Sequence, residues 1–233
     1  MEKTAENSYI LSIRINPDGF SLLINDESGS LLSTQHVSTA LINLSVEEIV
    51  RIISLEAPHY YKKVILICES DKYIFIPTPF FKKEEAVDFL YFQHKKDKHE
   101  RIMYNYISDW NTVNVFAVPA AIEQAMARLF PESLIEHQLS WLLKNRIKTQ
   151  QSSSLYVWVR SKMLDVIALK DGKLQLMNSF GYQTPEDFSY HTLDIIEQLS
   201  LDIEKCNVNL FNSEKKPELA RILEKYVTVN CLQ

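Results

Sequence analysis

Two short turns carry the side chains best suited to binding an anion. Asn16-Pro17-Asp18-Gly19 joins two apolar runs, and Arg160-Ser161-Lys162 joins two others. Proline presets φ and glycine accepts a positive φ, so a plain hairpin turn accounts for Asp18 and Gly19. Arg160, Ser161 and Lys162 offer two cations and a hydroxyl to an anionic ligand, although a solvated turn is the simpler interpretation. The sequence therefore predicts two hairpins, with ligand binding as the alternative at each.

The histidines show no spacing typical of catalysis or metal binding. His94 and His99 are five residues apart, whereas a spacing of four places two ligands on one face of a helix. No Walker loop, Gly-x-Ser-x-Gly or Cys-x-x-Cys motif occurs in the sequence. We therefore expect no metal site and no catalytic triad, and the sequence favours a protein that is not an enzyme. The other histidines are scattered along the chain: His36, His59, His137 and His191.

An aromatic pair in the middle of the chain is the candidate for a protein-binding surface. Phe80 and Phe81 follow the turn-forming segment Ile76-Pro77-Thr78-Pro79 and precede two lysines. An exposed aromatic pair rimmed by lysines is a reasonable anchor for a partner. The alternative is that both rings pack inward. We expect the partner-facing surface within Tyr73–Arg101, where it would bind another protein or a second copy of the chain.

Composition excludes several classes of partner. The chain has 233 residues, 46% of them hydrophobic, which suffices for a substantial core. A net charge of −5 creates no field that favours nucleic acid. No apolar stretch approaches the roughly 20 residues of a membrane-spanning helix, so we expect no direct membrane insertion. A polar N-terminus without a signal peptide, and three widely spaced cysteines, predict a cytoplasmic protein.

The elements that carry these residues follow a pattern that occurs twice. In each copy, three short apolar runs precede an amphipathic helix and a fourth apolar run. The first copy comprises Tyr9–Ile15, Phe20–Asn25, Leu31–Val37, the helix Val46–Ala57 and Val64–Cys68. The second comprises Leu155–Arg160, Leu164–Leu169, Lys173–Ser179, the helix Glu186–Leu199 and Val208–Phe211. A middle section separates the copies, which predicts one domain over residues 1–150 and a second over 151–233.

Local signals fix several element ends. Ser45 and Glu48 have the spacing of a capping box, and Thr184 before Pro185 predicts a second helix start. Asp171-Gly172 is typical of a tight hairpin turn. For the less regular segments, the sequence predicts strands at Leu134–Leu139 and Tyr226–Val229, and a helix at Trp141–Lys148.

A three-stranded antiparallel meander followed by helix and parallel strand resembles the ribonuclease-H-like unit. Two such units in tandem resemble the actin-like ATPase superfamily, and the stretch 113–121, VNVFAVPAA, looks like a strand-to-helix step of its pilus-assembly members. The chain as a whole is similar to an uncharacterised bacterial family, a domain of unknown function assigned an actin-like fold. The resemblance implies an α/β protein with tandem ribonuclease-H-like lobes and mixed sheets.

The same resemblance implies where a nucleotide would bind. In actin-like ATPases, glycine-containing acidic hairpins clasp the phosphates. Asp18 and Gly19 match in part, but Pro17 removes an N–H donor and Phe20 stands where a small hydroxyl would help. The second hairpin, at residues 160–162, has neither glycine nor aspartate, and the chain has only four glycines. We therefore expect a non-catalytic actin-like scaffold or protein-interaction module without a cofactor. The alternative is a divergent nucleotide-binding ATPase, or a sugar-kinase-like phosphotransferase, that uses ATP and Mg²⁺.

Overall fold

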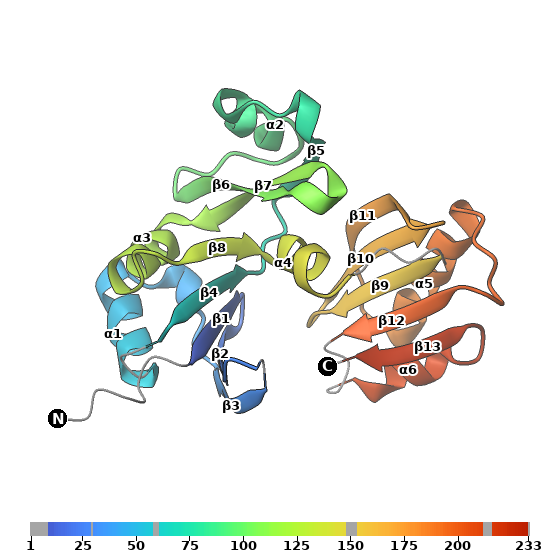
Figure 1. Cartoon of the computed structure of the whole chain (residues 1–233), viewed down its shortest axis with the longest axis horizontal. Helices are drawn as coiled ribbons and strands as arrows, with labels where there is room; N and C mark the ends of the chain where they lie inside the picture. The colour runs from blue at the N-terminus through green and yellow to red at the C-terminus, as the bar shows by residue number, and fades with distance from the viewer. Residues whose placement is uncertain (1–8, 29, 58–60, 148–152, 212–215, 233) are drawn as a thin grey trace. The chain divides into compact units, whose positions relative to one another are not determined.

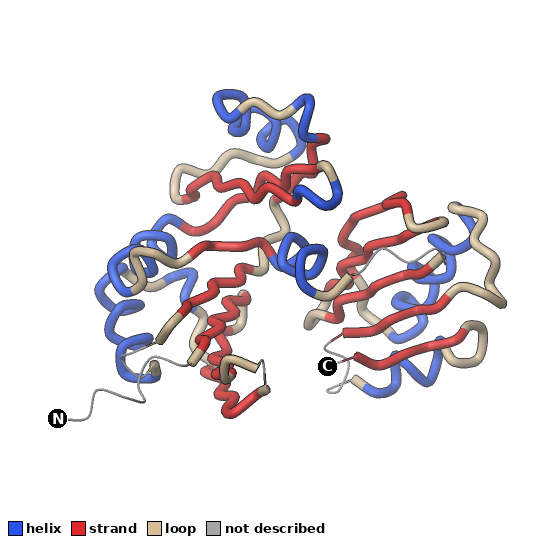
Figure 2. Tube along the Cα trace, in the orientation of Figure 1, coloured by secondary structure: helices blue, strands red, loops and turns tan. Residues whose placement is uncertain are grey.

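The computed structural model describes residues 9–28, 30–57, 61–147, 153–211 and 216–232. The chain divides into two compact units, Met1–Asn145 and Arg146–Gln233 (Figures 1 and 2). The domain boundary predicted after Gln150 falls among residues 148–152, which lie outside the described residues. Each unit is an α/β structure built on its own five-stranded mixed sheet.

The sheet of the first unit has the strand order β3-β2-β1-β4-β8. The first three strands form an antiparallel meander; β4 then pairs in parallel with β1, and β8 pairs in parallel with β4. The first four strands match the predicted apolar runs to within one residue at each end. The strands are β1 (Ile10–Asn16), β2 (Gly19–Asn25), β3 (Leu31–Val37), β4 (Lys63–Cys68) and β8 (Leu134–His137).

Helices α1 (Val46–Glu56) and α3 (Ala120–Leu129) pack together over one face of this sheet. The predicted capping box starts α1: the amide of Glu48 donates to Ser45 Oγ at 3.3 Å, and the amide of Ser45 donates to the Glu48 carboxylate at 2.9 Å. These bonds from Ser45 lower the pKa of Glu48. The core under the helices is formed by alternate residues of the strands, which include Leu11, Ile13 and Leu66.

The middle section forms a smaller antiparallel sheet in the order β5-β7-β6. Its strands are β5 (Tyr73–Pro77), β6 (Glu100–Ile107) and β7 (Thr112–Pro119). Strand β5 is an edge strand, a position that tolerates Pro77. Helix α2 (Ala86–Gln93) covers one face of this sheet through Ala86 and Leu90. Short 3₁₀ turns occupy Leu41–Asn43, Thr78–Phe80, Lys83–Glu85 and Ser108–Trp110.

One side chain ties the two sheets of the first unit together. Asn105 on β6 donates from Nδ2 to the carbonyl oxygen of Ile135 at 3.0 Å. Its Oδ1 accepts from the backbone N–H of His137 at 2.9 Å. Both backbone groups belong to β8, the last strand of the five-stranded sheet. The carboxamide of Asn105 therefore replaces a neighbouring strand along this edge.

The second unit repeats the strand arrangement of the first, with the order β11-β10-β9-β12-β13. An antiparallel meander is again followed by two parallel strands. Helices α5 (Pro185–Gln198) and α6 (Pro217–Leu223) pack over one face, and Thr184 caps α5 as predicted. The strands are β9 (Ser154–Val159), β10 (Met163–Lys170), β11 (Lys173–Gly181), β12 (Asn207–Phe211) and β13 (Thr228–Leu232).

Several predicted boundaries are wrong: the strand predicted over Leu134–Leu139 ends at His137, the helix after it ends at Asn145, and the last strand ends at Leu232. Helix α4 spans Gln138–Asn145 and so begins three residues earlier than predicted, because His137 Nδ1 accepts the backbone N–H of Leu139 at 3.3 Å and ends the preceding strand. The last strand begins two residues later than predicted, because the backbone N–H groups of Tyr226 and Val227 bond to the carbonyl of Leu223 and prolong the turn after α6. No helix in the described part of the chain is long and apolar enough to cross a membrane.

Candidate functional site

The first predicted site is the hairpin between β1 and β2. A Cβ atom at Gly19 would lie 2.2 Å from the carbonyl oxygen of Val37, so the close approach of β3 demands glycine here. Asp18 is exposed, and its backbone N–H donates to Asn16 Oδ1 at 3.1 Å. The next residue, Phe20, is fully buried in the core. Packing and the close approach of β3 thus account for Phe20 and Gly19, whereas the side chain of Asp18 is exposed.

The second predicted site, the hairpin between β9 and β10, differs from the expectation. Arg160 is only 7% exposed, so the prediction of a solvated turn is wrong for this residue, whereas Ser161 and Lys162 are exposed. Arg160 Nη2 donates to the carboxylate of Asp165 at 2.9 Å, and Asp165 is fully buried. Asp165 lies opposite Trp158 in the register, on the sheet face that Arg160 shares. Alternation places Trp158 and Arg160 on one face, but the register is needed to bring Asp165 beside them.

Protein groups fix the backbone of this second hairpin. Lys216 Nζ donates to the carbonyl oxygen of Ser161 at 2.5 Å and to Tyr182 Oη at 2.7 Å. Tyr182 Oη in turn donates to the carbonyl oxygen of Arg160 at 2.8 Å. The turn therefore presents carbonyl oxygens to a cation of the protein. A phosphate-binding turn would instead direct its N–H groups toward the ligand.

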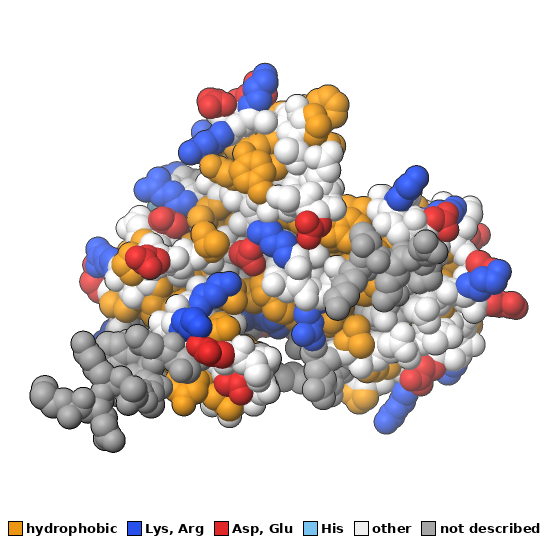
Figure 3. Space-filling view, in the orientation of Figure 1, with side chains coloured by type: hydrophobic (Ala, Val, Ile, Leu, Met, Phe, Trp, Pro, Cys, Tyr) orange, Lys and Arg blue, Asp and Glu red, His pale blue; other side chains and the backbone are white. Residues whose placement is uncertain are grey.

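The third predicted site is the aromatic pair. Phe80 is 71% exposed, whereas Phe81 is half-buried. The ring of Phe81 lies 5.3 Å from that of Tyr104 and 5.6 Å from that of Tyr106, and the ammonium of Lys83 lies 5.8 Å from the Tyr104 ring. Hydrophobic side chains reach the surface in this part of the chain, beside α2 and β6 (Figure 3). We call Phe80, Phe81, Tyr104 and Tyr106 the aromatic surface.

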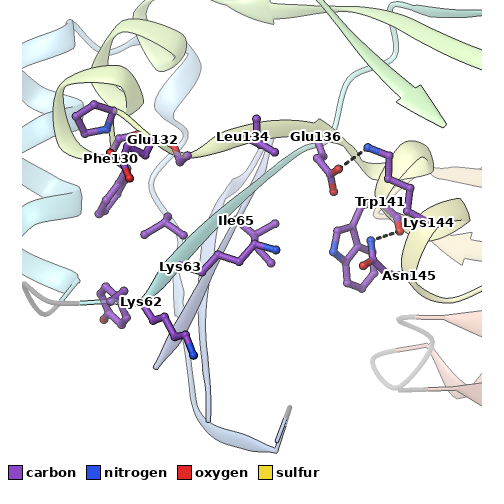
Figure 4. Close-up of a pocket in the computed structure, with 14 residues that line it drawn as sticks. Lys62, Lys63, Ile65, Phe130, Glu132, Leu134, Glu136, Trp141, Lys144 and Asn145 are labelled. Atoms are coloured by element: carbon purple, nitrogen blue, oxygen red, sulfur yellow. Dashed lines mark hydrogen bonds and ion pairs between the residues drawn. The ribbon is translucent and has the colours of Figure 1, made fainter. Parts of the chain in front are cut away.

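A pocket in the first unit was not predicted. It has a volume of about 540 Å³ and runs from the end of α3 across β4 and β8 to α4 (Figure 4). Its apolar lining includes Phe130, Leu134, Ile65 and Trp141, which come from three separate stretches of sequence. Because these stretches meet only in the folded sheet, no local motif announces the pocket. We call it the β4–β8 pocket.

Three lysines line the β4–β8 pocket. Lys62 bonds to Glu27 at 2.6 Å, and Lys144 bonds to Glu136 at 2.7 Å (Figure 4). Lys63 forms no ion pair with any residue that the structure describes, and Figure 4 shows its side chain extending toward Trp141. The pocket therefore holds one cation without a carboxylate partner among the described residues.

Two aromatic side chains of the pocket have distinctive surroundings. The guanidinium of Arg14 lies 5.7 Å from the Trp141 ring, so a cation–π contact holds the indole in place. Tyr61 also lines the pocket, and its Oη is buried without a hydrogen-bond partner in the described part of the chain. Burial raises the pKa of Tyr61, which keeps the phenol neutral and able to donate.

The described residues contain no cluster of three or more His, Cys, Asp or Glu side chains arranged to hold a metal ion. The fully buried His137 serves the fold: its Nδ1 accepts from Leu139 N, which leaves Nε2 to donate to the carbonyl oxygen of Ser70 at 3.0 Å. Burial raises the pKa of the Cys68 thiol to about 12, so it is a poor nucleophile.

Residues 1–229 match the family model described as protein of unknown function (DUF3822). The chain belongs to this family. A solved structure from Bacteroides thetaiotaomicron, a protein with an actin-like ATPase fold and unknown function, is 27% identical to this family member. The match covers 100% of this chain and 93% of that one, with a TM-score of 0.80. The chain therefore has the actin-like ATPase fold, as the sequence predicted.

A second solved structure, a PilM–PilN type IV pilus biogenesis complex, matches at a TM-score of 0.57 and 13% identity. It covers 96% of this chain and 88% of that one, and at this identity it supports the fold alone. No curated protein sequence matches the chain.

Proposed function

We propose that this DUF3822 member is a non-catalytic actin-like protein that binds a protein partner through its aromatic surface. The observation that carries this proposal is the exposure of Phe80, a residue that is 71% accessible to water. A large apolar side chain held in water gains free energy when a partner covers it. Exposed aromatic residues of this kind are the usual anchors of protein interfaces.

The neighbours of Phe80 suit a prepared binding surface. Phe81, Tyr104 and Tyr106 form a cluster of three rings with mutual centroid distances of 5.3 to 5.7 Å. Their contacts restrict the rings before a partner arrives, which lowers the entropy that binding costs. Lys83 and the exposed Lys82 add a polar rim. In PilM–PilN, a protein of similar fold is itself part of a protein complex.

The hairpins support a function without nucleotide turnover. Gly19 is accounted for by the carbonyl of Val37, and the second hairpin is occupied by Lys216. The competing function is a divergent ATPase or phosphotransferase that uses Asp18 with Mg²⁺ and ATP. Calorimetric titration with Mg-ATP separates the two, and we expect no heat of binding. Micromolar binding that Asp18→Ala abolishes would overturn the non-catalytic function.

The aromatic surface is tested by Phe80→Ala with Phe92→Ala as the matched control. Both phenyl rings are exposed, Phe92 to 90%, but Phe92 lies on α2 outside the aromatic surface. We expect both variants to keep the melting temperature of the wild type, because neither ring is buried. Phe80→Ala should lose the partner recovered from the native host by affinity capture, whereas Phe92→Ala should retain it. Equal recovery by both variants, or a drop of many degrees for Phe80→Ala, would contradict the proposal.

A further inference from the structure

We propose that the β4–β8 pocket binds a small amphipathic anion, a ligand with a bulky apolar body and a single carboxylate. The site is separate from the aromatic surface, so this inference does not depend on the proposed function. Its volume of about 540 Å³ lies within the range of pockets that enclose small molecules.

The apolar lining of the pocket determines the shape and polarity of the ligand body that it can hold. Phe130 and Trp141 stand on opposite sides of a floor made by Ile65 and Leu134 (Figure 4). Leu134 is 70% exposed, so a ligand lying on this floor would remove its side chain from water. Trp141 is already held by Arg14 and offers a fixed ring for stacking. A flat or branched apolar body fits this lining better than a sugar or a nucleotide phosphate chain does.

The charges of the pocket set the sign of the ligand. Glu136 and Lys144 neutralise one another, and Lys62 is held by Glu27. Lys63 extends toward Trp141 without a carboxylate partner among the described residues, and the remaining charged side chain of the lining, Glu132, lies beside Phe130 (Figure 4). One carboxylate on the ligand would complete the pairing, and a hydrogen-bonded ion pair in a partly enclosed site is stronger than one in water.

Tyr61 supplies a polar contact that the free protein leaves unused. Its Oη is buried and has no hydrogen-bond partner in the described part of the chain. A buried hydroxyl without a partner destabilises the folded state, and a ligand oxygen that accepts its proton removes this cost. Tyr61 and Lys63 are separated by one residue and both line the pocket, so we assign the polar groups of the ligand to these two residues.

Such a carboxylate has two sources, a free organic acid or the carboxyl end of a peptide. The probes are therefore 1-naphthylacetate and the dipeptide acetyl-Leu-Phe with a free carboxylate, each titrated into the full chain by calorimetry. Acetyl-Leu-Phe amide, which lacks the charge, is the matched control ligand. We expect saturable one-to-one binding of at least one of the two acids and at least tenfold weaker binding of the amide. Binding of naphthylacetate alone assigns the site to free acids, and binding of the dipeptide assigns it to chain ends; each supports the proposal.

Three variants test the assigned residues. Lys63→Met keeps the aliphatic stem and removes the charge, and it should weaken binding at least tenfold. Lys162→Met removes an exposed lysine of the second unit and should leave affinity unchanged. Tyr61→Phe should weaken binding several-fold while the melting temperature of the free protein stays equal or rises, a combination that a purely structural tyrosine would not give. Absence of binding by both acids at millimolar concentration, or affinity that Lys63→Met does not alter, would overturn the proposal.

Discussion

At the first hairpin, the carbonyl oxygen of Val37 leaves no room for a side chain at position 19. This constraint comes from the pairing of β2 with β3, which brings the end of β3 close to the backbone of Gly19. The adjacent Asp18 is free of such constraints because its side chain is exposed. Asp18 and Gly19 together resemble half of a phosphate-binding turn. The fold requires glycine at position 19 but places no such restriction on the side chain at position 18.

This difference predicts unequal effects of two alanine substitutions. Gly19→Ala should lower the free energy of unfolding by about 1–3 kcal/mol, because the new methyl group overlaps the Val37 carbonyl. Asp18→Ala should change it by less than about 0.5 kcal/mol, as is usual for an exposed residue. Urea denaturation measures both values. A destabilising Asp18→Ala, or a neutral Gly19→Ala, would show that the hairpin is not held as described.

Strand β8 depends on the side chain of a residue that belongs to another sheet. Its outer edge bonds to the carboxamide of Asn105 on β6, through the carbonyl of Ile135 and the N–H of His137. One side chain thereby joins the small three-stranded sheet to the five-stranded one. It also closes part of an edge that could otherwise pair with another chain.

Replacing this carboxamide should loosen β8. Asn105→Leu leaves two backbone groups of β8 without partners, and we expect a loss of about 2 kcal/mol or more of unfolding free energy. The amide hydrogen of His137 should exchange faster, because its acceptor is gone. Asn230→Leu on the exposed strand β13 serves as the control and should change stability by less than about 0.5 kcal/mol. Unchanged exchange at His137 in Asn105→Leu would refute the bridging role.

The elements that the sequence predicted well are those with local causes. Ser45 with Glu48 and Asp171 with Gly172 form the predicted cap and turn, the latter with φ values of 51° and 73°. The start of α4 depends instead on the side chain of His137, and the sequence there contains no capping motif that would predict it. The Arg160–Asp165 pair needed the strand register, and the β4–β8 pocket needed residues 61–65 to meet residues 130–145, which lie far away in sequence. Contacts between residues that are far apart in sequence cannot be predicted from the local periodicity of hydrophobic residues.

On the scale of the whole molecule, each unit has a core of its own. Each core contains one buried cysteine, Cys68 in the first unit and Cys206 in the second. The reactivity of each thiol therefore measures the unfolding of its own unit. Burial raises the pKa of both thiols, to about 12 for Cys68, whereas Cys231 is exposed. One thiol should therefore react with a disulfide reagent in the folded protein, and two should react only on unfolding.

These thiols allow the unfolding of the two units to be compared. In a Cys231→Ser background, we expect Cys68 and Cys206 to become reactive at different urea concentrations, because chains with separate cores commonly unfold in separate steps. Mass spectrometry of the labelled peptides identifies which thiol reacts first. Coincident midpoints for both thiols would show instead that the chain unfolds as a single cooperative system.

Strand β3 has a consequence for how the protein behaves in solution. Its residues 31–36 are exposed, Leu31 and Leu32 by more than half, and the segment LLSTQHV contains no lysine, arginine, aspartate or glutamate. An uncharged rim of this kind lacks the charged side chains that usually keep sheet edges apart. Repulsion between molecules then rests on the net charge of −5, which vanishes near the isoelectric point of about 5.7. Colloidal stability should accordingly be poorest in mildly acidic buffers and at high ionic strength, where this long-range repulsion is screened.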